Sequence, residues 1–222
     1  MRVGAIILAR ANFGRWPDKV LYEIGGKPMI EWVIMKALTV GYDEVIVSTT
    51  NHSEDEPIVK VAEKHGVPVS YGPADDRHLR NRIAAEDYNL DYIACPAPCM
   101  PFFDVWLSTV TLKYCREHSG YEAYFAGPHS DAGYPAHLRS TELLYRLSSD
   151  HHAEQIMRHS GDIEKMCVVF HYLDPEIINR YLINVNIAYP LQGVIANIVC
   201  DHLGHFPKNW DEVIKAYMEV RA

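Results

Sequence analysis

Several features that would place a chain in a particular class are missing from this sequence of 222 residues. No run approaches the roughly 18 apolar residues that a membrane span needs, and no signal-peptide pattern precedes the first expected strand. Basic residues are also few, since 21 Lys and Arg stand against 29 Asp and Glu and give a net charge of −8. We therefore expect a cytoplasmic protein that binds neither a membrane nor a nucleic-acid backbone.

Cysteine and glycine patterns disfavour three further classes. The five cysteines form no tight framework, which fits reduced thiols better than paired disulfides. Cys95 and Cys99 have a spacing that occurs in zinc sites, but no second pair lies at a matching distance, so single thiols are the preferred interpretation. No Gly-x-Gly-x-x-Gly turn follows the first expected strand, which argues against a dinucleotide-dependent enzyme.

Strand-like and helix-like segments alternate along the chain, which predicts an α/β fold with a mainly parallel sheet. The pattern becomes irregular from residue 122 to 181, and we interpret this stretch as an inserted arm within a single domain spanning 1–222. Strands are expected at 3–8, 44–48, 67–71, 90–94, 166–171 and 182–187. Helices are expected behind Pro28, after a cap at Ser53, and at 77–86, 105–117, 140–147, 191–203 and 209–220.

A cluster of cations follows the first expected strand. Arg10, Arg15 and Lys19 come after it in close succession, and Gly25-Gly26-Lys27-Pro28 opens the next helix. Ligands of open α/β sheets bind at the carboxyl ends of the strands, where guanidinium forks and a lysine can hold phosphate oxygens. A solvated basic loop is the alternative interpretation, and the position at a strand end favours the phosphate site.

The order and spacing of Ala9-Arg10, Arg15-x-Pro17-x-Lys19 and the Gly-Gly-Lys-Pro segment resemble the cytidylyltransferases that make CMP-activated sugars. The spore-coat-polysaccharide type is the most similar branch, beside the acylneuraminate and KDO cytidylyltransferases. Weaker matches follow at Asp75-Asp76 with Arg82 and at Pro101-Phe-Phe-Asp104. The resemblance implies a nucleotide-diphospho-sugar transferase (GT-A-like) three-layer fold with a mixed sheet, and a homodimer built through the arm.

The resemblance also implies a reaction. A sugar or sugar acid attacks the α-phosphorus of CTP and pyrophosphate leaves, with Mg²⁺ offsetting the phosphate charge, in a pathway to cell-surface polysaccharide. The resemblance assigns the family roles to the matching positions of this sequence. The triphosphate is then held by Arg10, Arg15 and Lys19, and the expected catalytic cations are Arg10 and Lys19. The backbone of Leu8, Ala9 and Arg10 reads the base, and Arg82 contacts base or sugar. The candidate sugar contacts are His137, His151 and His152.

Two positions depart from the family pattern. Cys99 and Ala188 stand where the family has the aspartates that bind the metal, and Mg²⁺ prefers hard oxygen ligands. Asp104, five residues beyond Cys99, is a candidate replacement ligand; an amide from Asn184 or Asn186, or a metal carried in by the nucleotide, are others. The sequence thus leaves open an active, divergent transferase and a degenerate homologue that binds a nucleotide or nucleotide-sugar without turnover.

Overall fold

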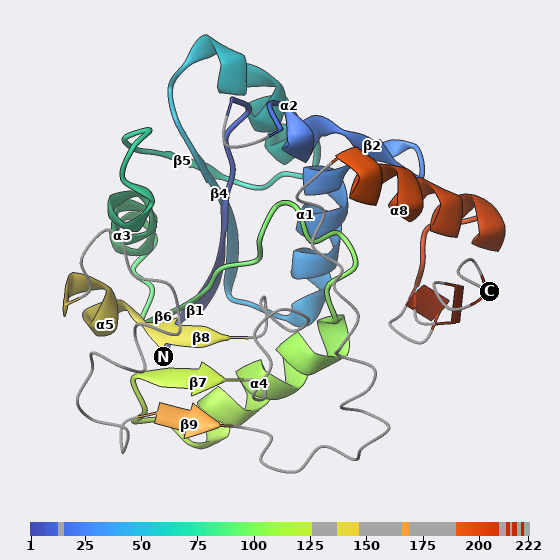
Figure 1. Cartoon of the computed structure of the whole chain (residues 1–222). Coiled ribbons are helices and arrows are strands. Elements are labelled where there is room, and N and C mark those ends of the chain that lie inside the picture. Colours follow the sequence, from blue (N-terminus) through green and yellow to red (C-terminus); the bar gives the residue numbers. More distant parts are fainter. Residues whose placement is uncertain are drawn as a thin grey trace.

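The computed structural model describes residues 1–12, 16–125, 137–146, 166–168 and 190–208, and single positions at 212, 213, 215, 216 and 219. Within these residues, a seven-stranded sheet with the order β5-β4-β1-β6-β8-β7-β9 runs through the centre, with helices on both faces (Figure 1). Four of its six strand pairings are parallel. The predicted α/β class with a mainly parallel mixed sheet is therefore confirmed.

Four parallel strands place their carboxyl ends at one edge of the sheet. β1 (Val3–Leu8) lies between β4 (Glu44–Thr49) and β6 (Tyr92–Ala94), and β5 (Val69–Tyr71) pairs with the outer side of β4. Because β1 is covered on both faces, its first five residues are buried and its sequence is almost continuously apolar. The segments that follow β1, β4, β5 and β6 are consequently neighbours in space.

The remaining strands of the sheet come from the stretch 122–181. β8 (Leu138–Ser140) runs antiparallel to both β6 and β7 (Ala123–Phe125), and β9 (Met166–Val168) pairs parallel with β7. The description of the whole stretch as an inserted arm stays a prediction, since most of it lies outside the described residues. A separate hairpin joins β2 (Glu23–Ile24) to β3 (Lys27–Pro28).

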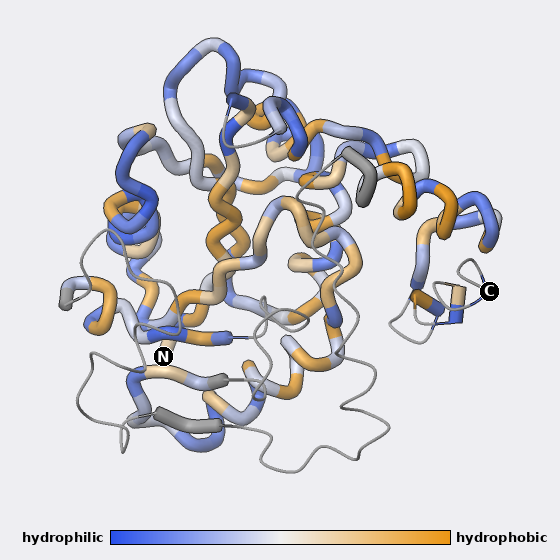
Figure 2. The backbone as a smooth tube through the Cα atoms, in the orientation of Figure 1, coloured by the Kyte–Doolittle hydropathy of each residue, from blue (hydrophilic) through white to orange (hydrophobic). Residues whose placement is uncertain are grey.

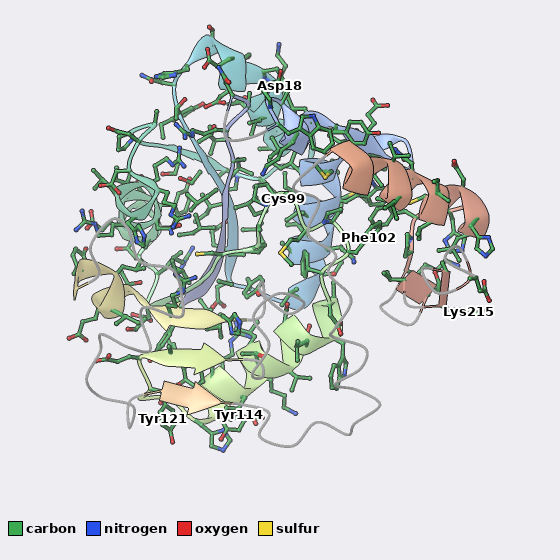
Figure 3. All side chains as sticks on the ribbon, in the orientation of Figure 1. Asp18, Cys99, Phe102, Tyr114, Tyr121 and Lys215 are labelled. Carbon is green, nitrogen blue, oxygen red and sulfur yellow. The ribbon has the colours of Figure 1, made fainter. Side chains whose placement is uncertain are left out.

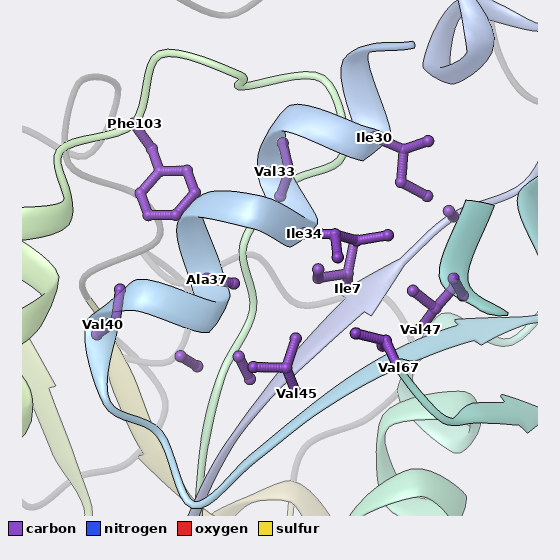
Figure 4. Close-up of a cluster of buried hydrophobic side chains, with 14 of the residues drawn as sticks. Ile7, Ile30, Val33, Ile34, Ala37, Val40, Val45, Val47, Val67 and Phe103 are labelled. Atoms are coloured by element: carbon purple, nitrogen blue, oxygen red, sulfur yellow. The ribbon is translucent and has the colours of Figure 1, made fainter. Parts of the chain in front are cut away.

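Helices cover the two faces of the sheet unequally. α1 (Met29–Val40), α2 (Glu56–Lys64) and α4 (Val105–Glu117) pack on one face, and α3 (Arg77–Asp87) and α5 (Thr141–Arg146) pack on the other. Figure 4 shows side chains of β1 and β4 against those of α1. In Figure 2 the apolar residues gather along the central strands and the inner sides of these helices. The core thus holds the strand ends rigidly.

The last described helix returns to the first part of the chain. α8 (Pro190–Leu203) packs on the β2 strand, where the side-chain oxygen of Asn197 accepts from the Gly25 amide at 3.0 Å and its nitrogen donates to the Glu23 carbonyl at 3.1 Å. At Gly193 the approach is so close that an added Cβ would lie 2.8 Å from the Tyr22 ring. Among the described residues, no helix has the length and apolar character to cross a membrane.

Several element boundaries differ from those expected. The strands expected at 67–71 and 90–94 are shorter, and α8 begins one residue early, at Pro190. Ser53 does not cap a helix; it opens a 3-10 turn (Ser53–Asp55) that leads into α2. The expected strand 182–187 and most of the expected helix 209–220 lie outside the described residues.

Candidate functional site

The loop that follows β1 is held to the end of β4 by one buried carboxylate. Asp55 is 2% exposed, and its Oδ1 accepts from the Ala11 amide at 2.7 Å. Its Oδ2 accepts from the amide and the hydroxyl of Thr50, at 3.3 Å and 2.5 Å. Burial would raise the pKa of Asp55, but these hydrogen bonds outweigh it and lower the pKa. An ionised Asp55 therefore fixes the cation-bearing loop beside the strand ends.

Arg80, on α3, brings a second guanidinium to this loop. The residue is 5% exposed, and no described residue offers a hydrogen-bond acceptor to its Nε or Nη1 atom. Burial lowers the pKa of Arg80 to about 10 and the charge of Arg10 acts in the same direction, while Asp55 and Asp76 oppose them. Arg80 therefore stays charged at neutral pH, close to Arg10 and with donors unused. Such a group is suited to an anionic or carbonyl-bearing ligand.

A glycine makes room for Arg80. Gly72 follows β5, and an added Cβ there would lie 2.7 Å from the Cγ atom of Arg80 and 3.4 Å from its backbone Cα atom. Any side chain at residue 72 would displace Arg80. Asp76 fixes the same region from the other side, since its carboxylate accepts from the Leu79 amide at 2.8 Å and caps α3. The two features fix the position of Arg80 in the first turn of α3.

The charge of Lys19 acts on the thiol of Cys99. Burial raises the pKa of the Cys99 thiol, and the nearby charge of Lys19 only partly opposes this effect. Figure 3 labels Cys99 beside the upper part of α1, in the same half of the molecule as Asp18, the neighbour of Lys19. The thiol is thus neutral at pH 7. Lys19 has no ion pair with any acidic side chain in the described part of the chain.

Asp104 is held as a helix cap. Its Oδ1 accepts from the amides of Trp106 and Leu107, at 2.9 Å and 3.3 Å, at the start of α4. No group of three His, Cys, Asp or Glu residues that could hold a metal ion occurs within the described ranges. A capping carboxylate and a neutral thiol do not make the oxygen-rich shell that Mg²⁺ requires. The described residues therefore do not fit the metal site that the resemblance implies.

The other predicted site residues fall into three groups. Leu8 and Ala9 end β1 beside Arg10, and the Ala9 amide donates to the Ser48 carbonyl at 3.0 Å. His137 is buried at the start of β8, where burial and then Arg139 lower its pKa to about 3 and keep the imidazole neutral. The residues that lie outside the described part of the chain are Arg15, His151, His152 and Ala188.

Arg82 is not placed with the other cations. Its guanidinium lies over the Tyr145 ring, 5.8 Å from the ring centroid, whereas the charge of Arg10 acts on Arg80. Helical spacing could have identified this difference, because Arg80 is four residues before the buried Ala84 and Arg82 only two. Asp55 was also missed, and nothing in the acidic run around it signals that it would turn inward.

Comparison with known proteins places the chain in a family. A family model described as cytidylyltransferase matches residues 4–126, which is more than half of the chain. The chain therefore belongs to the cytidylyltransferase family, as the resemblance indicated. A curated 3-deoxy-manno-octulosonate cytidylyltransferase from Vibrio parahaemolyticus is 39% identical over 84 residues, and one from Coxiella burnetii is 38% identical over the same length. Each match covers 38% of this chain and 32% of the relative, so the chain spans about a third of these relatives.

Solved structures extend the similarity of fold over the whole chain. A cytidylyltransferase from Leptospira borgpetersenii aligns with a TM-score of 0.83 at 20% identity and covers 100% of this chain and 95% of its own. A CMP:2-keto-3-deoxy-manno-octonic acid synthetase complexed with CTP aligns with a TM-score of 0.56 at 16% identity over 76% of this chain and 89% of its own. These similarities confirm the predicted nucleotide-diphospho-sugar transferase fold.

Proposed function

We propose that the chain is a cytidylyltransferase that activates a sugar acid with CTP and releases pyrophosphate. The observation that carries the proposal is a buried, charged Arg80 on which the charge of Arg10 acts. The Nε and Nη1 atoms of Arg80 have no acceptor among the described residues. Membership of the cytidylyltransferase family supports the reaction, and the names of the partly matching relatives support 3-deoxy-manno-octulosonate as the first sugar to test.

In this proposal, the cations act on the phosphates of CTP. Arg10, Lys19 and Arg15 hold the triphosphate, and Arg10 and Lys19 stabilise the charge that develops as pyrophosphate departs. A sugar hydroxyl oxygen forms a bond to the α-phosphorus and releases its proton to water, while the bond from the α-phosphorus to the pyrophosphate oxygen breaks. The sequence assigned a base or sugar contact to Arg82, and in this proposal Arg80 contacts the nucleotide in its place.

The backbone near Ala9 has fewer free groups than the resemblance suggests. The amide of Ala9 donates to the Ser48 carbonyl, and the amide of Ala11 donates to Asp55. Recognition of the base therefore falls to other atoms of the Leu8 to Arg10 segment. His137 would contribute as a neutral group, since burial keeps its pKa low.

The finer expectations from the resemblance belong to the same proposal. These are a homodimer, a cytoplasmic location, a role in cell-surface polysaccharide synthesis and a domain spanning 1–222 with an arm at 122–181. Magnesium, which the resemblance also implies, enters no step here, because the described residues do not fit its ligand shell. The alternative of a homologue without turnover rests on the replacements at Cys99 and Ala188, and the comparisons do not favour it.

A pyrophosphate-release assay tests the proposal. The purified chain is incubated with CTP, ATP, GTP or UTP and with a panel of sugar acids that includes 3-deoxy-manno-octulosonate, with and without Mg²⁺. We expect release with CTP and at least one sugar acid, and the loss of this release in Arg10→Gln. Saturable binding of CTP without pyrophosphate from any sugar of the panel would instead support the homologue without turnover.

A further inference from the structure

Cys99 replaces a negative charge with a neutral group at the place where the family resemblance implies a metal-binding aspartate. Its thiol lies close enough to Lys19 for the ammonium charge to act on it. An aspartate there would attract both Lys19 and a divalent cation, whereas a neutral thiol attracts neither. The Lys19 ammonium therefore remains available to a ligand that brings its own negative charge.

Arg80 and the arginines that act on it outnumber the carboxylates that act on it. Arg80 is buried, charged and close to Arg10, and Arg77 adds a third guanidinium. Asp55 and Asp76 are the carboxylates that act on Arg80, and both already accept backbone amide hydrogen bonds. In the family pattern a metal offsets part of the phosphate charge. Here the described side chains supply cations, and no three of their His, Cys, Asp or Glu residues form a group that could hold a metal ion.

We infer that this site binds CTP without a divalent cation held by the protein, the charge of the triphosphate being met by Arg10, Lys19 and Arg80. The inference rests on the proposed function, because it takes CTP as the ligand. It separates this chain from the metal-dependent pattern that its family resemblance implies. Binding of CTP then does not require a magnesium ion.

Calorimetric titration of the whole chain with CTP, in excess EDTA and in excess Mg²⁺, tests the inference. We expect the Kd in EDTA to be no more than about twofold larger than the Kd in Mg²⁺. A Kd in EDTA that exceeds this limit would overturn the inference and leave the proposed function standing. Absence of CTP binding in both buffers would overturn both.

Two variants of nearly equal size locate the effect at residue 99. Cys99→Asp restores a carboxylate, which repels the phosphates and pairs with Lys19, so we expect its Kd in EDTA to rise by about tenfold and Mg²⁺ to reverse that rise. Cys99→Asn has the same shape without the charge and should bind as the wild type does in both buffers. Equal Kd values for Cys99→Asp and Cys99→Asn in EDTA would contradict the inference. Thermal unfolding of each variant shows whether it is folded. If neither variant folds, the Kd values of the wild type in EDTA and in Mg²⁺ still test the inference.

Discussion

Arg80 is a charged group in a place from which water is largely excluded, and that placement costs folding free energy. A buried ion is stable only when partners replace its hydration, and here Nε and Nη1 have no acceptor among the described residues. Gly72 and Asp76 nevertheless hold the region in which Arg80 sits. A binding role explains this arrangement, because donors of Arg80 that make no hydrogen bond in the folded chain can donate to a ligand.

Substitution of the two arginines of α3 separates binding from folding. In Arg80→Gln the side chain keeps most of its length and loses its charge, so we expect the Kd for CTP to rise by about tenfold or more, with no loss of thermal stability. Arg82→Gln is the matched control on the same helix and should bind CTP as the wild type does. Calorimetric titration and thermal unfolding measure both effects. Weaker binding in Arg82→Gln alone would restore the original assignment of that residue.

The sequence predicted the cations next to the first strand because Arg10 and Lys19 are fixed by local spacing. It missed Arg80 and Asp55, whose roles depend on where a helix and a turn lie in three dimensions. Arg80 could have been found from the helical period of α3. Asp55 could not, since only the packing of the 3-10 turn against β4 directs it to Ala11 and Thr50.

At the scale of elements, Glu31 joins α1 to the end of α2. This residue of α1 is almost fully buried, and its Oε1 accepts from Lys64 Nζ at 2.8 Å and lies 3.1 Å from His65 Nε2 at the end of α2. Burial would raise the pKa of Glu31, but these hydrogen bonds outweigh it and lower the pKa. The ionised carboxylate therefore stabilises the packing of α1 against α2.

The contribution of Glu31 should depend on pH. Because its pKa is lower in the folded than in the unfolded chain, the stabilisation is complete above the unfolded value of 4.5 and is lost as the pH falls through the folded value. We expect Glu31→Gln to lower the free energy of unfolding by about 1–2 kcal/mol at pH 7, and by less in acid. Urea unfolding of the wild type and the variant, at pH 7 and at a pH below 4.5, measures these losses of unfolding free energy. Glu56→Gln, which alters an exposed pair with Lys60, is the control, and an equal loss in both variants would contradict this account.

Long elements were predicted better than short ones. The helices α1, α3 and α4 and the strands β1 and β4 have clear periods and lengths, and the sequence located them within a few residues. β7 and β8 have three residues each and no local pattern that identifies them, because their registers are set by pairing with β6 and with each other. The sequence consequently describes this part of the sheet only as irregular.

At the scale of the whole molecule, an acidic chain concentrates positive charge at one point. The net charge is −8, yet the charges of Arg10 and Arg77 act on Arg80, and Lys19 acts on Cys99 near the strand ends. A general attraction to anions is therefore excluded, and the site has to recognise a compact, multiply charged group locally. A distant part of the chain supports the same region. α8, from the C-terminal third, packs against the β2–β3 hairpin that leads into α1.

If Arg10, Lys19 and Arg80 hold the phosphates of CTP, calorimetric titration of the unmodified chain with CTP and, separately, with cytidine will show it. The two ligands share a base and a ribose and differ in the triphosphate. The account predicts one CTP bound per chain, with a Kd at least about tenfold smaller than that of cytidine. Equal affinity for the two ligands, or no binding of CTP, would contradict it.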